Sequence, residues 1–307
     1  MSTECYNAVM NNIKFEGLGL DLNINPVMVD INGIKIYWYA FIIIMGVAVC
    51  LLLCRRDDGK YKIKFDDILL LALFLLPIAI ICARIYFVLF KLDYYIQNPS
   101  ELFSIQNGGL AIYGGIIGAI GTIIVFCKIK KIKLLDVLDY LAPYLALGQC
   151  IGRWGNFFNG EAHGTETDCF LRMGIVEDGK YIQVHPTFLY ESICTLLIFI
   201  FLFVRRNKRR YNGELTYWYF FLYGIARAII EGFRTDSLML GPLRVSQILS
   251  IALSAVFGSL LLYKGIKLKN SKKNGAQEGA KEATEIEDDV QDDAKIEDAQ
   301  VSKEKDE

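Results

Sequence analysis

Long runs of apolar residues, separated by short polar segments, dominate the chain. Seven of these runs approach or exceed the roughly 20 residues that an α-helix needs to cross the hydrocarbon core of a bilayer. The pattern predicts an all-α, polytopic membrane protein with seven transmembrane helices. No internal repeat is visible, which argues against a transporter built from two similar halves. The predicted helices are residues 36–54, 68–90, 109–127, 134–157, 187–204, 215–233 and 245–263.

The polar flanks predict three parts. Residues 1–35 are too polar to span a membrane, and we expect them to form an arm on the outer surface. We expect residues 36–265 to form a seven-helix transmembrane domain, in which any chemistry would lie, and residues 266–307 to form a disordered acidic cytoplasmic tail. Within the arm, apolar residues at every second position indicate either a short strand or an interfacial segment. These residues are Val27, Val29 and Ile31.

Composition and charge support this division. The chain has 307 residues, of which 53% are hydrophobic, and a mean hydropathy of +0.33. From Gly275 onward there are thirteen acidic and four basic residues, a net charge of −9, which leaves +8 for the rest of a chain whose total is −1. That tail is too poor in large apolar residues to fold. The positive charges lie in short loops, so we expect no nucleic-acid partner.

The basic residues predict the orientation. They follow the first, third, fifth and seventh predicted helices, which places all of them on one side of the membrane. By the positive-inside rule that side is cytoplasmic, so the N-terminus is outside and the C-terminus is cytoplasmic. Representative pairs are Arg55 and Arg56, Lys128 and Lys130, Arg205 and Arg206, and Lys264 and Lys267.

The stretch GRWGNFFNGEAHG (152–164) closes the fourth apolar run with charged and amide side chains. Charged residues inside a membrane are costly and mark functional sites. Arg153 alone could simply extend toward the lipid surface, as arginines near helix ends do. Similarly, Arg227 and Glu231 are four residues apart and could form a purely structural pair within one helix.

The helix directions weaken these simpler interpretations, because polar residues from several helices reach the same depth at the outer leaflet. Arginines at headgroup depth suit a bidentate grip on phosphate. The residues alone therefore indicate a protein that binds an anionic phospholipid headgroup. The polar set consists of Tyr39, Arg84, Tyr113, Arg153, Asn156, Glu161, His185, Tyr190, Glu191, Arg227, Glu231 and Arg234.

Five ordered motifs resemble those of the prolipoprotein diacylglyceryl transferase family, over about residues 30–265. They are GRWGNFFNGEAHG, GGLAIYGGIIGA (108–119), HPTFLYE (185–191), YGIARAIIEGFR (223–234) and SQILS (246–250). The resemblance implies transfer of the sn-1,2-diacylglyceryl group from phosphatidylglycerol to the lipobox cysteine thiol of prolipoproteins, with release of glycerol 1-phosphate. It also implies that the protein lies in the bacterial cell membrane and uses no metal or soluble cofactor.

The resemblance also implies site residues. Arg153 and Asn156 lie at the centre of the family's site, Arg227 and Glu231 are essential or nearly so, and Tyr39 matches an important tyrosine of the first helix. We assign catalytic roles to Arg153, Asn156, Arg227, Glu231 and Tyr113. We assign substrate binding to Arg153, Tyr39, Arg84, Glu161, Gly164, Tyr190 and Arg234.

Tyr113 departs from the family pattern, which commonly has histidine there as the favoured base for the incoming thiol. Tyrosine, with a pKa of about 10, is a poor base but a good hydrogen-bond donor. We therefore expect Tyr113 to orient the headgroup, and nearby guanidinium charge to produce the thiolate. His163 is a weaker candidate base, and a solvated loop histidine is the better interpretation. An anionic-lipid transporter and a non-catalytic lipid-binding scaffold are the alternative functions.

Overall fold

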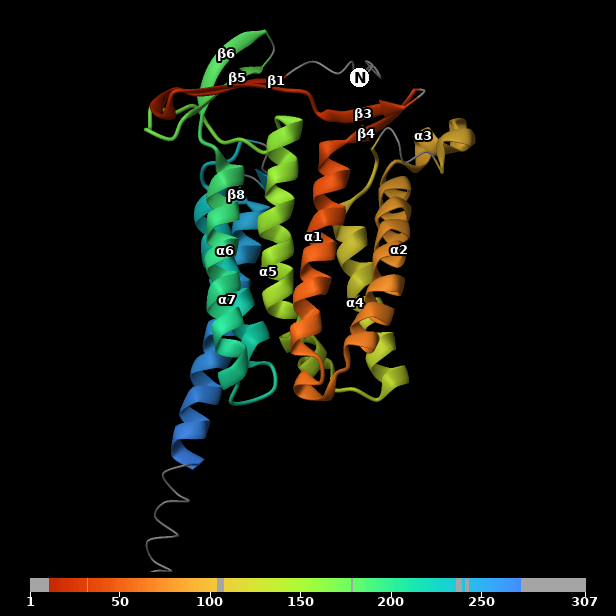
Figure 1. Cartoon of the computed structure of the whole chain (residues 1–307), viewed down its shortest axis with the longest axis vertical. Coiled ribbons are helices and arrows are strands. Elements are labelled where there is room, and N and C mark those ends of the chain that lie inside the picture. The colour runs from red at the N-terminus through yellow and green to blue at the C-terminus, as the bar shows by residue number, and fades with distance from the viewer. Residues whose placement is uncertain are drawn as a thin grey trace, which may run out of the picture. The chain divides into compact units, whose positions relative to one another are not determined.

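Each of the seven apolar runs contains a helix (Figure 1). The structure is a computed structural model that describes residues 11–31, 33–103, 108–177, 179–235, 239–240 and 243–271. The helices are α1 (Trp38–Cys54), α2 (Phe65–Phe90), α4 (Ile112–Lys130), α5 (Leu134–Asn159), α6 (Thr187–Arg205), α7 (Glu214–Glu231) and a last helix, Val245–Ser271.

Six of these helices are long and apolar enough to cross a membrane. The helix α7 is not among the six, because its 18 residues include three charged side chains, Glu214, Arg227 and Glu231. The mostly helical membrane fold is therefore confirmed, with six candidate spans among the described residues. The chain divides into two compact units, Met1–Phe257 and Gly258–Glu307, and the described residues of the second unit are the end of the last helix.

The polar segments contain short strands that the all-α prediction missed. A four-stranded antiparallel sheet has the order β2-β1-β5-β6 and joins the N-terminal arm to the loop between α5 and α6. The predicted alternation in the arm forms β3, which pairs with β4. The strands are β1 (Asn11–Phe15), β2 (Leu20–Ile24), β3 (Val27–Ile31), β4 (Ile34–Tyr37), β5 (Met173–Glu177), β6 (Lys180–Val184), β7 (Met239–Leu240) and β8 (Leu243–Arg244).

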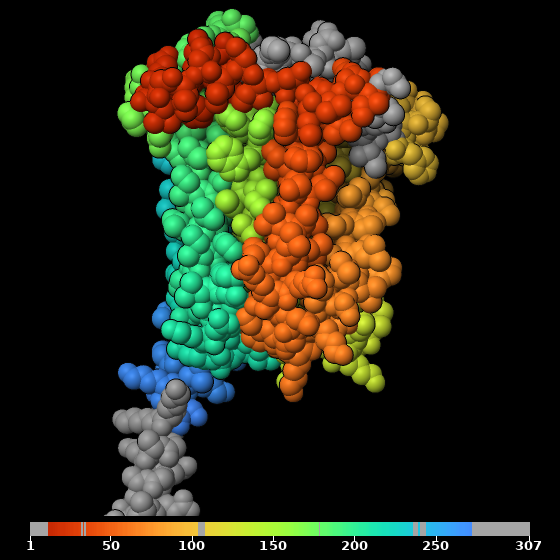
Figure 2. Space-filling view, viewed as in Figure 1, coloured from red at the N-terminus to blue at the C-terminus, as the bar shows by residue number. Residues whose placement is uncertain are grey.

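The strands of the N-terminal arm lie across one end of the helices, which we call the hairpin end (Figure 2). Apolar side chains hold the sheet there. Ile13 of β1 and Met173 of β5 are buried in one cluster with Phe157 of α5 and Phe188 of α6. Burying side chains of this size stabilises the fold by about 1.5–3 kcal/mol each. The sheet therefore packs directly onto the ends of α5 and α6.

The helix α5 lies at the centre of the helical packing, where it contacts α1, α6 and α7, whereas α2 pairs with α4. Glycine allows the close approach of α2 and α4. A Cβ atom at Gly118 would lie 2.7 Å from the Cβ atom of Cys82. This confirms the close-packing role that small residues often have between membrane helices. Two short helical segments, α3 (Leu92–Gln97) and Pro99–Glu101, follow α2.

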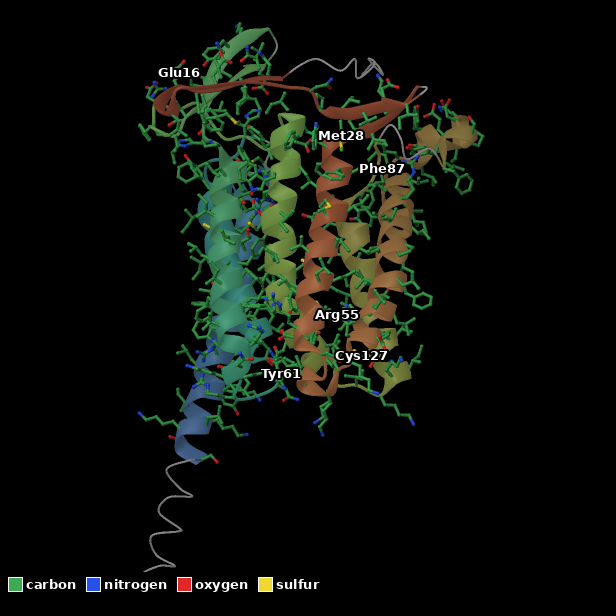
Figure 3. The ribbon with its side chains drawn as sticks, viewed as in Figure 1. Glu16, Met28, Arg55, Tyr61, Phe87 and Cys127 are labelled. Carbon is green, nitrogen blue, oxygen red and sulfur yellow. The ribbon has the colours of Figure 1, made fainter. Side chains whose placement is uncertain are left out.

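The opposite end of the helices is held by buried ion pairs. Figure 3 places Glu16 and Met28 at the hairpin end, and Arg55, Tyr61 and Cys127 toward the opposite end. There arginines at the end of α6 and in the loop that follows it bind buried carboxylates. Arg209 binds Asp139 (3.1 Å) and Arg205 binds Glu214 (2.5 Å). Asp139 also accepts hydrogen bonds from the backbone N–H groups of Gly213 (2.7 Å) and Thr216 (2.9 Å), so a residue of α5 caps the start of α7.

Candidate functional site

Glu191 of α6 joins three helices near the hairpin end. Its side chain is almost fully buried, with the residue 2% exposed. Oε1 accepts hydrogen bonds from Arg153 of α5 and from the hydroxyl of Tyr223 of α7 (3.3 Å). Oε2 accepts one from Nη1 of Arg227 of α7 (2.9 Å). A buried carboxylate requires such partners, because it has lost its hydration.

Arg227 bridges two carboxylates. Besides the contact with Glu191, its Nη2 atom lies 2.6 Å from Oε2 of Glu231, one turn further along α7. The predicted pair within one helix therefore exists, and the same guanidinium also reaches a neighbouring helix. Glu231 is 1% exposed. The side chains of Arg153 and Arg227 are 22% and 16% exposed, so neither is as fully enclosed as the carboxylates that they bind.

A chain of hydrogen bonds runs outward from Arg153 along the end of α5. Nη1 of Arg153 donates to Oδ1 of Asn156 (3.2 Å), and Nδ2 of Asn156 donates to Oε1 of Glu161 (2.9 Å). Nδ2 of Asn159 donates to the same oxygen (3.3 Å). The helix ends at Gly160, whose φ of +68° favours glycine. The turn at Gly160 brings Glu161 back to the two asparagines.

Tyr39 of α1 packs against this part of α5. A Cβ atom at Gly155 would lie 2.7 Å from Cδ2 of the Tyr39 ring, so glycine is needed for the ring to approach. The structure thus places Tyr39 beside the segment that carries Arg153 and Asn156. This agrees with the grouping of these three residues that the sequence predicts.

Gly164, at the end of the GRWGNFFNGEAHG stretch, ties the α5–α6 loop to the end of α7. It forms an antiparallel bridge with Arg234, and its N–H group donates to the carbonyl oxygen of His185 (2.8 Å). A Cβ atom at Gly164 would lie 2.7 Å from the carbonyl oxygen of Phe233. The backbone at this position therefore has no room for a side chain.

Tyr190 faces away from the Glu191 carboxylate. Its hydroxyl lies 3.2 Å from Nδ1 of His185 and 3.7 Å from Sγ of Cys169. Burial lowers the pKa of His185 below its usual value, so the imidazole is neutral at pH 7. His163 lies elsewhere in the loop, with Nε2 3.6 Å from an oxygen of Glu177, which suits a loop histidine.

Two predicted site residues make their contacts elsewhere. Arg84 of α2 is 8% exposed and donates to the carbonyl oxygens of Glu101, Leu102, Gly108 and Gly109. Its described contacts therefore hold backbone rather than the Glu191 cluster. Tyr113 begins α4 and is 46% exposed, and its ring lies 6.5 Å from the ring of Tyr86 on α2.

Glu191 belongs to the polar set predicted from the sequence but carries no site assignment there, and Tyr219 and Tyr223 are not in that set. Tyr219 and Tyr223 stack with ring centroids 5.7 Å apart, and the Tyr219 hydroxyl donates to Oε1 of Gln149 (2.8 Å). The spacing of the two tyrosines could have linked them to the site. Residues 219, 223, 227 and 231 are four apart, which places both tyrosines on the face of α7 that carries Arg227 and Glu231. Among the residues that the structure describes, no three His, Cys, Asp or Glu side chains gather to hold a metal ion.

Comparison with known proteins shows which proteins this chain is similar to. The family model described as prolipoprotein diacylglyceryl transferase matches residues 26–263. Relatives named phosphatidylglycerol–prolipoprotein diacylglyceryl transferase are 48% identical in Finegoldia magna (73% of this chain and 89% of the relative) and 45% identical in Clostridioides difficile (78% and 94%). A relative of the same name from Listeria monocytogenes is 42% identical (80% and 91%).

Proposed function

The chain belongs to the prolipoprotein diacylglyceryl transferase family, and from that premise we propose how its residues carry out the transfer. The activity is transfer of a diacylglyceryl group from phosphatidylglycerol to a prolipoprotein, the first step of lipoprotein maturation. The acceptor that we propose is the thiol of a lipobox cysteine. The leaving group is glycerol 1-phosphate.

The observation that carries the proposal is the pair of arginines on Glu191. Arg153 and Arg227 come from different helices, and each is held by one oxygen of the same buried carboxylate. In our proposal both guanidinium groups bind the phosphate of phosphatidylglycerol. Their planar donors match phosphate geometry. Glu191 fixes the two groups in place before the lipid arrives, so no reorganisation is needed during the reaction.

The reaction forms one bond and breaks another. The sulfur of the acceptor thiolate attacks the glyceryl carbon that bears the phosphate, a C–S bond forms, and the C–O bond to the phosphate breaks. The electron pair of that bond leaves with the phosphate oxygen, where negative charge develops. Arg153 and Arg227 stabilise this charge in the transition state. The thiol proton is released to solvent when the thiolate forms.

Residues around the arginines position the two substrates. We assign Asn156 and Glu231 to holding the guanidinium groups of Arg153 and Arg227, to which they are hydrogen-bonded or paired. The outward chain to Glu161 supports a contact with the hydroxyl groups of the lipid headgroup. We place four further residues around the entering substrates: Tyr39, Gly164, Tyr190 and Arg234.

The acceptor thiol needs only a small lowering of its pKa to form the thiolate near neutral pH. A free cysteine has a pKa of about 8.5, and nearby guanidinium charge lowers it. We propose that Tyr113 contacts the lipid as a hydrogen-bond donor, which its exposed position at the start of α4 supports. The contacts of Arg84 instead support a role in holding the segment that leads into α4.

We also propose the orientation of the protein in the bacterial cell membrane. The hairpin end, with the Glu191 cluster, faces outward, and the C-terminus is cytoplasmic. The basic loop at residues 205–210 lies at the opposite end, as the positive-inside rule requires. The helix α7 completes the seven spans, because its charged residues Arg227 and Glu231 are paired and face protein. Residues 272–307, the bulk of the predicted acidic tail, lie outside the described residues.

A direct assay tests the function. Purified protein is incubated with phosphatidylglycerol and a lipobox peptide, and the peptide is weighed by mass spectrometry. We expect a gain of one diacylglyceryl group. We expect no gain when the peptide cysteine is replaced by serine, or when phosphatidylcholine replaces phosphatidylglycerol. Lipid movement across vesicles with no peptide modification would instead support the transporter.

A further inference from the structure

The last helix forms hydrogen bonds to the backbone of α7. Nε2 of Gln247 donates to the carbonyl oxygen of Ala228 (2.9 Å). Two turns further along, Oγ of Ser254 donates to the carbonyl oxygen of Phe221 (3.0 Å). Side chain to backbone contacts of this kind between apolar helices are directional, so they fix where one helix lies along the other.

Two backbone carbonyl groups at the C-terminal end of α7 accept hydrogen bonds from side chains at the start of the last helix and just before it. The last four carbonyl groups of a helix have no N–H partner within it, and in α7 these include Ala228 and Glu231. The carbonyl oxygen of Glu231 accepts the N–H group of Arg234 just beyond the helix (3.2 Å). Gln247 binds the carbonyl oxygen of Ala228, and the guanidinium of Arg244, the residue before the last helix, binds that of Glu231. A cation at this end also suits the helix dipole. The last turn of α7 is therefore capped by the start of the next helix.

The backbones of α7 and the last helix also approach too closely at Gly224 for one helix to shift along the other. A Cβ atom at Gly224 would lie 2.7 Å from the carbonyl oxygen of Ser250 and 3.0 Å from Cβ of Ser254. The glycine on α7 and the small side chains facing it on the last helix allow this spacing. A shift of α7 by one residue would place Ile225 or Tyr223 against these atoms, so its register is fixed.

The capped turn carries the phosphate-binding arginine. Arg227 immediately precedes Ala228, and its guanidinium must reach Glu191 and Glu231 together. We propose that Gln247, with Arg244, is a positioning residue that sets the last turn of α7 and thereby the place of the Arg227 guanidinium. This rests on the proposed function, in which Arg227 binds the lipid phosphate. It gives the SQILS motif a physical role.

Gln247 gives the cleaner test, because it carries no charge that could itself bind phosphate. Gln247→Leu keeps the size of the side chain and removes the donor, which leaves the Ala228 carbonyl uncapped. In full-length protein we expect kcat/KM for phosphatidylglycerol to fall about tenfold, mostly through KM. The matched control is Leu249→Ala, two residues along on an exposed face of the same helix, which should stay within about twofold of wild type.

Binding of the product separates positioning from simple stabilisation. Glycerol 1-phosphate is titrated against each variant and its Kd is read from the shift in melting temperature. Gln247→Leu and Ser254→Ala should both lower the melting temperature without ligand. Only Gln247→Leu should raise the Kd, by about tenfold, because Ser254 binds α7 nearly two turns away from Arg227. A wild-type Kd and KM in Gln247→Leu would overturn the proposal and leave Gln247 as a structural cap. Failure of the wild type to modify the peptide would overturn the proposed function instead, and the Kd comparison would still decide the positioning role.

Discussion

Arg153 and Arg227 bind opposite oxygens of one buried carboxylate, that of Glu191, although they belong to different helices. Without the negative charge of the Glu191 carboxylate between them, the two positively charged guanidinium groups would repel each other. Glu191 therefore determines their separation, and the separation determines what anion they can hold together.

The first prediction concerns Arg153 and Asn156. Lysine offers one ammonium group in place of a planar fork, so it cannot bind Glu191 and a phosphate with the same geometry. We expect Arg153→Lys and Asn156→Ala each to lower the transfer rate by at least about 100-fold. The measurement is peptide modification per mole of protein in the membrane fraction. Wild-type transfer by Arg153→Lys would mean that Arg153 only anchors the end of α5.

The second prediction concerns the charge of Glu191. Glu191→Gln keeps the shape but leaves Arg153 and Arg227 with no carboxylate between them, and breaking a buried pair of this kind costs about 3–5 kcal/mol. We expect a large drop in melting temperature in detergent and loss of transfer. Glu16→Gln is the control, because Glu16 pairs with Arg172 at 3.1 Å in a far more exposed position. That change should leave the melting temperature almost unchanged, because solvent screens an exposed ion pair. Equal losses in the two variants would contradict the central role of Glu191.

The third prediction separates Arg84 from the phosphate-binding arginines. One lysine ammonium cannot serve the carbonyl oxygens of Glu101, Leu102, Gly108 and Gly109 at once. Arg84→Lys should therefore lower the melting temperature, while KM for phosphatidylglycerol in the folded protein stays within about twofold. A large rise in KM with an unchanged melting temperature would restore the lipid-binding role that the sequence predicts.

The fourth prediction concerns Tyr113. A lost hydrogen bond is worth about 1 kcal/mol, so Tyr113→Phe should lower transfer by no more than about fivefold. Tyr113→His should be tolerated, and Arg153→Ala should be far worse than either. The rate should rise with pH as the acceptor thiol ionises, and His163→Asn should not move that limb. If Tyr113→Phe is as inactive as Arg153→Ala while still folded, Tyr113 takes part in proton transfer.

The apolar runs predicted every long helix because length and hydropathy are properties of single segments. They also placed Arg153, Asn156 and Arg227 at a common depth. Depth says nothing about the direction in which each side chain points around its helix. Glu191 was therefore included in the polar set at that depth, while its position between two arginines depends on how three helices pack.

The role of Arg84 was hidden for a different reason. Its partners are backbone carbonyl groups, which every residue has, so no sequence pattern marks them. The four-stranded sheet was missed because β1 and β5 are each only five residues long and lie far apart in the chain. The arginines at 205–210 were correctly grouped by charge. Their pairing with Asp139 and Glu214 required the fold.

The pairing of β1 with β5 has a consequence for biogenesis. Lys14 lies opposite Gly174, so β1, which pairs on its other edge with the nearby β2, finds this second partner only after 160 further residues have been made. At about 5–20 residues per second, that takes on the order of 8–30 seconds. Until then the apolar face of β1, with Ile13 and Phe15, lacks the residues of β5 and α6 that cover it. In the orientation proposed above, the four-stranded sheet is thus a late step of assembly, completed only when the loop after α5 has also crossed the membrane.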